Sequence, residues 1–211
     1  MKKLFLVLAL LALLPVAAAS ADPIAVGNTV SLTLGVGNAH GGGAFWMSTP
    51  GHPNAFLTFC LEMNEYFTPG ANYIVGNLST AAMNGGVGGP SPDPLDPMTA
   101  YLYTMFRTGV YGVPTETLAN SLQAAIWYIE QEIGVAERNS WGGTALYNEA
   151  FAAVSSGRWT GLGNVRVVNL VDAQGGLHQD QLTMVPEPGS MVLLGSGLFG
   201  MAGAIRRRVR K

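Results

Sequence analysis

The most reactive side chain in this sequence belongs to Cys60, the one cysteine among 211 residues. A lone cysteine excludes an internal disulfide framework, so Cys60 is a buried small apolar residue, a partner in an intermolecular disulfide, or a nucleophilic thiolate. A cysteine hydrolase needs a histidine base near the thiol. His40, His52 and His178 are available, but none lies in a recognisable motif. The sequence leaves these three interpretations of the cysteine open.

Gln123 is the residue that could react with Cys60. The segment 120–127, NSLQAAIW, places its amide among apolar neighbours on a predicted helix. A buried amide must find hydrogen-bond partners or react. If the Cys60 thiolate attacked the side-chain carbonyl of Gln123, ammonia would leave and an internal thioester would form. A strand and a helix would have to hold sulfur and carbonyl at contact distance, because proximity supplies most of the rate.

This pair resembles the thioester domains of bacterial surface adhesins. In that family an aromatic-Cys motif on an early strand is joined to the glutamine of a Gln-x-Ala-Ile-Trp motif. The corresponding residues here are Phe59-Cys60 and the segment 123–127, QAAIW. The resemblance implies a single-use acyl donor, captured by an amine-bearing surface or matrix component, and not an enzyme that turns over. No lysine lies between Asp22 and Ile205. This gives weak support to a thioester, because the amine of a lysine on the same domain could react with the thioester and destroy it.

Acidic residues elsewhere in the sequence give weaker signals. Glu62 and Glu65 have a spacing that would suit an acid–base pair, but we expect a solvated strand end. Asp93 and Asp96 lie in a Pro-rich loop that lacks the pattern of a complete calcium loop. We therefore predict no metal site and no cofactor.

The charge of the chain is unevenly distributed. Between Asp22 and Glu187 the sequence has four arginines against 13 acidic residues, a net charge of −9, while the other basic residues lie near the two ends. This acidic middle excludes nucleic-acid binding through the phosphates. Charged residues make up 11% of the chain and hydrophobic residues 48%, so a charge-driven disordered chain is also excluded.

Residues 1–21 have the three parts of a secretory signal peptide. Two lysines precede an apolar run over 4–14, and small residues at Ala19 and Ala21 form a cleavage site. We expect the chain to pass through the secretion translocon and to begin at Asp22 after cleavage.

A second targeting segment is predicted at the C-terminus. The uncharged stretch 189–205 covers roughly 25 Å at about 1.5 Å per residue, which predicts a short transmembrane helix. Arg206, Arg207 and Arg208 would hold its end in the cytoplasm. The stretch is preceded by Val185, Pro186, Glu187 and Pro188. This order resembles the PEP-CTERM sorting signal. The resemblance implies that residues 186–211 are a targeting segment that is removed after export.

The resemblance implies recognition by an exosortase, which cuts near the Pro-Glu-Pro motif. Such proteins occur in Gram-negative bacteria that make exopolysaccharide and biofilm matrix. The implied route is an exported precursor tethered transiently to the cytoplasmic membrane and then released to the cell surface or the extracellular matrix. The alternative is a permanent single-span anchor.

Residues 22–185 are left as the exported domain. Strands are predicted over 24–36, 55–61, 71–78, 165–172 and 178–185. Helices are predicted over 98–108, 115–133 and 144–155, and Gly-rich or Pro-rich loops over 35–43 and 85–97. This order indicates an α+β fold, with β-sandwich or barrel-like strands and an inserted helical segment.

Three classes of function fit these observations. The first is covalent attachment through a Cys60–Gln123 thioester, which we expect. The second is a non-covalent carbohydrate- or protein-binding matrix module in which Cys60 is structural. The third is a Cys-dependent acyl transferase or hydrolase.

Overall fold

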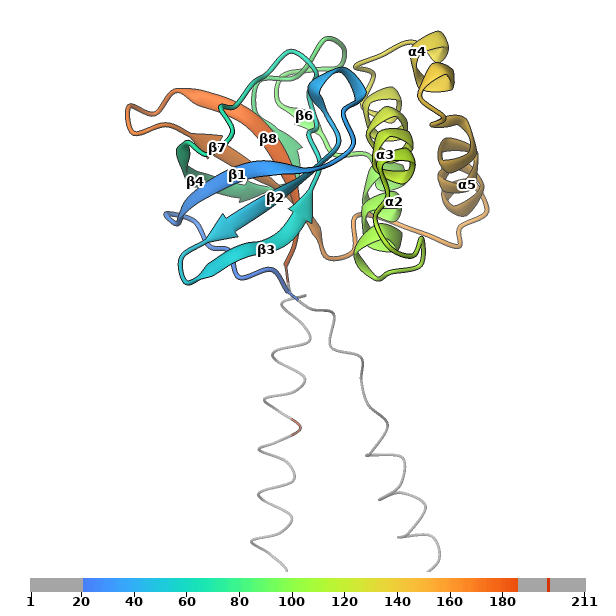
Figure 1. Cartoon of the computed structure of the whole chain (residues 1–211). Coiled ribbons are helices and arrows are strands. Elements are labelled where there is room, and N and C mark those ends of the chain that lie inside the picture. Colours follow the sequence, from blue (N-terminus) through green and yellow to red (C-terminus); the bar gives the residue numbers. More distant parts are fainter. Residues whose placement is uncertain (1–20, 186–196, 198–211) are drawn as a thin grey trace, which may run out of the picture.

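The computed structural model describes residues 21–185 and 197, and over 21–185 the chain forms a sheet-rich α+β fold (Figure 1). The strands of this region are β1 (Thr29–Val36), β2 (Ala44–Thr49), β3 (His52–Thr58), β4 (Asn72–Ser79), β5 (Ala81–Ala82), β6 (Asp93–Pro94), β7 (Val165–Val171) and β8 (Leu177–Met184). The helices are the 3-10 turn η1 (Ala39–Gly41), α2 (Pro97–Arg107), α3 (Glu116–Ile129), α4 (Val135–Ser140) and α5 (Thr144–Ser155). The predicted α+β class is confirmed. The signal peptide and the C-terminal helix and sorting signal fall outside the described residues, apart from Val185 and residues 21 and 197.

The six long strands form one antiparallel sheet in the order β3-β2-β1-β4-β7-β8. The chain directly after β3 returns to β8 and joins the two edges. Leu182 N–H donates to the Phe59 carbonyl at 3.2 Å, Leu61 N–H donates to the Asp180 carbonyl at 3.2 Å, and Cys60 forms a bridge with its partner on β8. We call this pairing of 59–61 with 180–182 the seam. It curls the sheet into a partly closed barrel, so of the two predicted alternatives the barrel-like one describes these strands.

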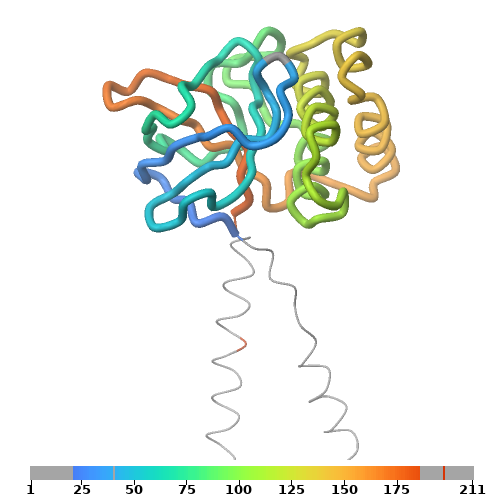
Figure 2. The backbone as a smooth tube through the Cα atoms, in the orientation of Figure 1, coloured from blue at the N-terminus to red at the C-terminus, as the bar shows by residue number. Residues whose placement is uncertain are grey.

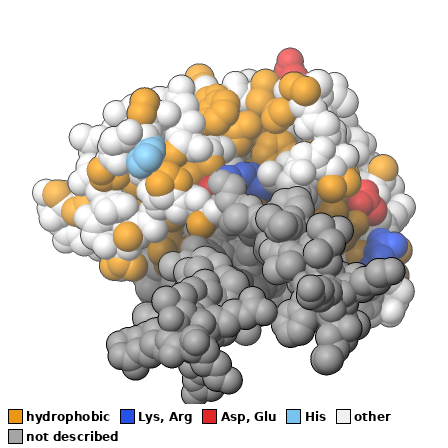
Figure 3. Space-filling view, turned by 90° about the horizontal axis from the view of Figure 1, so that it is seen from below, with side chains coloured by type: hydrophobic (Ala, Val, Ile, Leu, Met, Phe, Trp, Pro, Cys, Tyr) orange, Lys and Arg blue, Asp and Glu red, His pale blue; other side chains and the backbone are white. Residues whose placement is uncertain are grey.

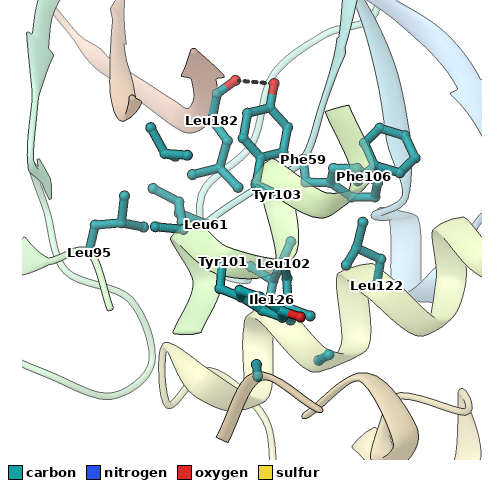
Figure 4. Packing of buried hydrophobic residues seen from close by; sticks show 14 of the residues in the cluster. Phe59, Leu61, Leu95, Tyr101, Leu102, Tyr103, Phe106, Leu122, Ile126 and Leu182 are labelled. Atoms are coloured by element: carbon teal, nitrogen blue, oxygen red, sulfur yellow. Dashed lines mark hydrogen bonds between the residues drawn. The ribbon is translucent and has the colours of Figure 1, made fainter. Parts of the chain in front are cut away.

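The helices cover one side of the barrel, with α2 and α3 between the strands and α5 (Figure 1). Their apolar faces meet the seam in a buried cluster that includes Phe59, Leu102, Leu122 and Leu182 (Figure 4). The Tyr103 hydroxyl, on α2, donates to the Leu57 carbonyl at 2.9 Å and lies 3.2 Å from the Leu182 carbonyl. Helix α2 is therefore tied to both edges of the closed sheet.

A second buried cluster fills the barrel itself. It includes Val30, Met47, Val75 and Leu170 from four strands, together with Cys60. Charged side chains are sparse on the face that Figure 3 shows, as the low charge content of the sequence predicts.

Both ends of the region 21–185 meet at one point (Figure 2). Asp22 N–H donates to the Met184 carbonyl at 2.9 Å. The Asp22 carboxylate accepts two hydrogen bonds from Arg107, at 2.6 and 2.8 Å, and one from the Thr183 hydroxyl at 2.9 Å. The first residues of the region are thus fixed to β8 and to α2.

Several predicted elements differ from the observed ones. Helix α3 begins after the cap at Thr115 but ends at Ile129, not 133, because Gln131 has a φ of 67° and breaks the helical path. Strand β2 and helix α4 were not predicted, and the predicted strand over 24–36 starts only at Thr29. Among the residues that the structure describes, no helix is both long and apolar enough to span a bilayer.

Candidate functional site

The structure brings Cys60 and Gln123 together, although 63 positions separate them in the chain. Cys60 lies on the seam and Gln123 in the middle of α3. Gln123 Nε2 donates to the Cys60 carbonyl at 2.9 Å, and Gln123 Oε1 accepts from Cys60 N–H at 3.2 Å. The two residues are 3% and 0% exposed, respectively. The amide is therefore held against the cysteine backbone and away from water.

A second backbone amide reaches the same oxygen. Gly43 N–H donates to Gln123 Oε1 at 3.2 Å. Gly42 lies so close to the glutamine that a Cβ on it would be 2.7 Å from Gln123 Cγ. Two backbone N–H groups converging on one carbonyl oxygen have the arrangement of an oxyanion hole, which stabilises negative charge on that oxygen. The sequence did not identify these donors, because Gly43 lies 80 positions from the glutamine that it contacts.

Among the described residues, one polar side chain contacts the Cys60 sulfur. Gln181 Nε2, on β8, donates to Sγ at 3.4 Å. Burial raises the pKa of the Cys60 thiol to about 12, the Gln181 hydrogen bond opposes this rise, and the charge of Glu62 adds to it. At neutral pH the resting side chain is therefore a protonated thiol.

The structure describes the side chains of two of the three candidate histidines. His52 is exposed at the start of β3. His178 lies by Asp172, with 3.4 Å between Nε2 and Oδ2, and packs on the Tyr73 ring. Within the described region, no hydrogen bond or ring contact connects either side chain to Cys60.

A cluster of carboxylates lies beside the seam. Glu62, Glu65 and Asp180 each offer an oxygen, and these oxygens all lie within 4.8 Å of one another. Burial, and then the charge of Asp180, raise the pKa of Glu62 to about 9. Burial likewise raises the pKa of Asp180 to about 7 and is the largest cause of the raised pKa of Glu65.

The expectation of a solvated strand end is wrong for Glu62, which is 2% exposed. The chain turns inward after the seam, where Gln179 Nε2 donates to the Glu62 carbonyl at 2.5 Å. The other acidic pair is structural in part, since Asp96 caps α2 by accepting from Met98 N–H at 2.7 Å.

An open cleft of about 500 Å³ adjoins the carboxylate cluster, since Glu65 belongs to both. It is lined by Asn64, Glu65, Tyr66, Phe67, Thr68, Tyr73, Asn84, Gly85, Leu177 and His178. Its wall combines aromatic rings with amide, hydroxyl and carboxylate groups, a mixture suited to polar ligands. Sequence reasoning missed this cleft because its residues come from four separate segments.

Residues 185–208 match the model of the PEP-CTERM protein-sorting motif. This range contains the sorting residues identified in the sequence, Val185, Pro186, Glu187, Pro188, Arg206, Arg207 and Arg208. No curated protein and no solved structure matches the chain significantly. The motif implies recognition by an exosortase during export, and the protein is accordingly an exported protein that is processed at the membrane.

Proposed function

We propose that the exported domain forms an internal thioester between Cys60 Sγ and Gln123 Cδ, and uses it to attach covalently to an amine-bearing component of the cell surface or matrix. The observation that carries this proposal is the convergence of Gly43 N–H and Cys60 N–H on Gln123 Oε1. Any buried glutamine needs hydrogen-bond partners. Two donors on its side-chain carbonyl oxygen, next to a cysteine, would in addition stabilise the negative charge that develops on this oxygen during acyl transfer.

The chemistry is balanced within the two side chains. The Cys60 sulfur attacks Gln123 Cδ, and the two backbone N–H groups stabilise the charge that develops on Oε1. The C–N bond then breaks, and the thiol proton leaves with the nitrogen as ammonia. In the second step an amine nitrogen attacks Cδ, the C–S bond breaks, and the proton lost by the amine restores the Cys60 thiol. The product is an amide between Gln123 and the partner.

Burial supports the stability of such a bond before capture. Gln123 is fully buried and Cys60 is 3% exposed, so bulk water is kept from the acyl carbon. The Gly-rich segment 37–43 covers the glutamine, and Asn38 N–H in it donates to Asn120 on α3 at 2.6 Å. An amine would reach the acyl carbon when this segment moves. Because the acyl donor is consumed, the protein would act once and would not turn over as an enzyme.

Intact mass spectrometry of the full chain, purified in detergent, tests the proposal. Loss of ammonia should lower the mass by about 17 Da relative to the same chain with an unmodified glutamine, and methylamine should then add about 31 Da. Both changes should disappear in Gln123→Ala and Cys60→Ala. Gln174→Ala removes an exposed glutamine from the β7–β8 turn and should behave like the wild type.

An unmodified mass, together with a Cys60 thiol that is alkylated once the chain is unfolded, would refute the thioester. Steady turnover of an added ester or amide would instead indicate the cysteine acyl transferase or hydrolase.

A second candidate function rests on the cleft of about 500 Å³. Tyr66, Phe67 and Tyr73 supply aromatic faces, and Asn64 and Asn84 supply amides, which together suit a carbohydrate ligand of the matrix. In this alternative Cys60 is a core residue, and Cys60→Ala would retain full binding to matrix polysaccharide while Tyr66→Ala would lose it.

A further inference from the structure

The carboxylate cluster beside the seam has features that a structural role does not explain. Glu62 and Glu65 come from the segment that follows the seam, and Asp180 comes from β8. Their closest oxygens lie within 4.8 Å of one another. Like charges at this distance repel each other, so the fold must gain something by collecting them.

Glu62 is the member of the cluster that points to a ligand. Glu62 is 2% exposed, and neither of its carboxylate oxygens has a hydrogen-bond partner among the described residues. Glu65 Oε2 is also buried without a partner. A buried carboxylate without a donor is costly, and buried charges are normally paired or bound to a metal. Three acceptor atoms without donors in one cluster leave two ways to offset this cost: protons, which the raised pKa of Glu62 shows are held tightly, or a positive ion from outside the protein.

No arginine of the described region forms an ion pair with the cluster, since Arg107 pairs with Asp22. The charge of His178 lowers the pKa of Glu65, but the His178 ring forms its ion pair with Asp172. The acidic middle of the sequence contains no lysine. Nearby Glu132 increases the negative charge, and its own oxygens accept hydrogen bonds from the backbone N–H groups of Met63, Val87 and Gly88. A cation from outside the protein would compensate the ionised form of this cluster.

We propose that Glu62, Glu65 and Asp180 bind a calcium ion. Calcium takes oxygen ligands at about 2.3–2.6 Å, so two oxygens bound to one ion are at most roughly 5 Å apart. The oxygens of this cluster, all within 4.8 Å of one another, meet that limit. Asp180 Oδ2 accepts from Asn169 Nδ2 at 2.9 Å and from Met83 N–H at 2.7 Å, which orients the carboxylate as second-shell hydrogen bonds orient metal ligands. Water molecules would complete the coordination.

Calcium fits the cluster better than magnesium does. Magnesium prefers oxygens at about 2.0–2.1 Å in a rigid octahedron and gives up its water reluctantly. Exported proteins also meet calcium at concentrations that suit weak sites, with dissociation constants of about 10⁻⁴–10⁻³ M. The ion would fix the segment after the seam to β8, two residues from Cys60.

Thermal unfolding of the full chain in detergent, after treatment with EDTA, tests this site. Calcium chloride at about 10 mM should raise the Tm by about 3–10 °C, and an equal concentration of magnesium chloride should have a smaller effect. Terbium, which replaces calcium in oxygen sites, should show luminescence sensitised by nearby tyrosines, and calcium should displace it.

Two variants separate a specific site from a general ionic effect. Glu62→Gln keeps the shape of the side chain, removes the carboxylate that would bind calcium, and should abolish the calcium-dependent rise in Tm. Glu65→Gln, at a partly exposed position, should weaken calcium binding at least tenfold and serves if Glu62→Gln does not fold. The control Glu116→Gln changes an exposed glutamate on α3 and should keep the wild-type response. A wild-type Tm that calcium leaves unchanged, or an equal rise in Glu62→Gln, would overturn the proposal.

Discussion

Gly42→Ala would place a methyl group directly against the proposed reacting glutamine. The new Cβ would lie 2.7 Å from Gln123 Cγ and 2.5 Å from Trp127 Cη2, both closer than real Cβ contacts allow. The backbone at Gly42 is extended, with φ −90° and ψ −169°, which alanine adopts without strain. The substitution therefore acts through the side chains of α3 and not through the backbone of its own loop.

The size of the effect follows from these distances. To reach an ordinary separation of about 3.5–4 Å, the glutamine must move by about 1 Å. Gln123 Oε1 is already 3.2 Å from both Gly43 N–H and Cys60 N–H, so the same displacement breaks at least one of the two bonds. Loss of one oxyanion donor lowers a rate by about 10²–10³-fold. Overpacking should also lower the free energy of unfolding by about 1–3 kcal/mol.

The two quantities are measured separately. Urea unfolding gives the free-energy change, and the time course of the mass loss during refolding gives the rate of thioester formation. Gly134→Ala is the matched control, because this glycine also has an ordinary φ of −84° and its nearest neighbour to an added Cβ is 3.8 Å away. A Gly42→Ala protein with wild-type stability and a wild-type rate of thioester formation would refute the reasoning from this contact.

Three further predictions concern the fold around the site. Asp22→Asn should lower the unfolding free energy by about 3 kcal/mol in urea unfolding, because it removes the buried carboxylate that pairs with the partly buried Arg107 guanidinium; an effect below about 1 kcal/mol would contradict this. Burial raises the pKa of Glu130 to about 8, so the folded protein holds this proton more tightly than the unfolded chain does. The protonated Glu130 therefore stabilises the folded state fully below about pH 4, and this contribution is lost as the pH rises to about 8. Glu130→Gln should therefore raise the unfolding free energy by about 1–3 kcal/mol at pH 8 and leave it unchanged at pH 4, as urea unfolding at both pH values would show. Thr115→Ala removes the N-cap of α3 and should lower the unfolding free energy by about 1 kcal/mol, with Thr115→Ser retaining wild-type stability.

The helices were predictable where local chemistry marks their ends. Helix α5 covers the predicted residues 144–155, and Thr115 caps α3 with its side chain as the capping pattern indicates. The end of α3 was wrong because the apolar repeat continues to Ile133 after the helix has stopped. Ile133 is buried, but it lies in the turn that follows the helix, and periodicity alone does not distinguish a helical position from a buried turn position.

The missed elements are those that depend on tertiary contacts. Strand β2 follows a Gly-rich segment that reads as loop, and it is a strand because β1 and β3 pair with its two edges. Helix α4 spans six residues, Val135–Ser140, too few for a periodic pattern to be recognised. The burial of Glu62 also depends on tertiary contacts, because it follows the seam, in which residues 59–61 pair with β8.

The candidate site was only partly readable from the chain. The two short motifs around Cys60 and Gln123 suggested that these residues meet, and the structure places them in contact. The groups that would act on them come from distant segments with no motif of their own. Gly43 is 80 positions from the glutamine, and Gln181 is 121 positions from the cysteine that it contacts. Such donors cannot be identified from the sequence, because they reach the two residues only in the folded barrel.

A thioester at this position would change the mechanics of the domain as well as its chemistry. It would cross-link α3 to the seam and close a loop over 63 positions, which in a chain-entropy model stabilises a fold by about 4 kcal/mol. Capture by an amine opens that loop again and returns a free thiol to the seam. The protein would therefore be most rigid before attachment, when water must be kept from the acyl carbon, and looser afterwards, when the new amide needs no protection. The proposed calcium ion, two residues away at Glu62, would hold the seam together in both states.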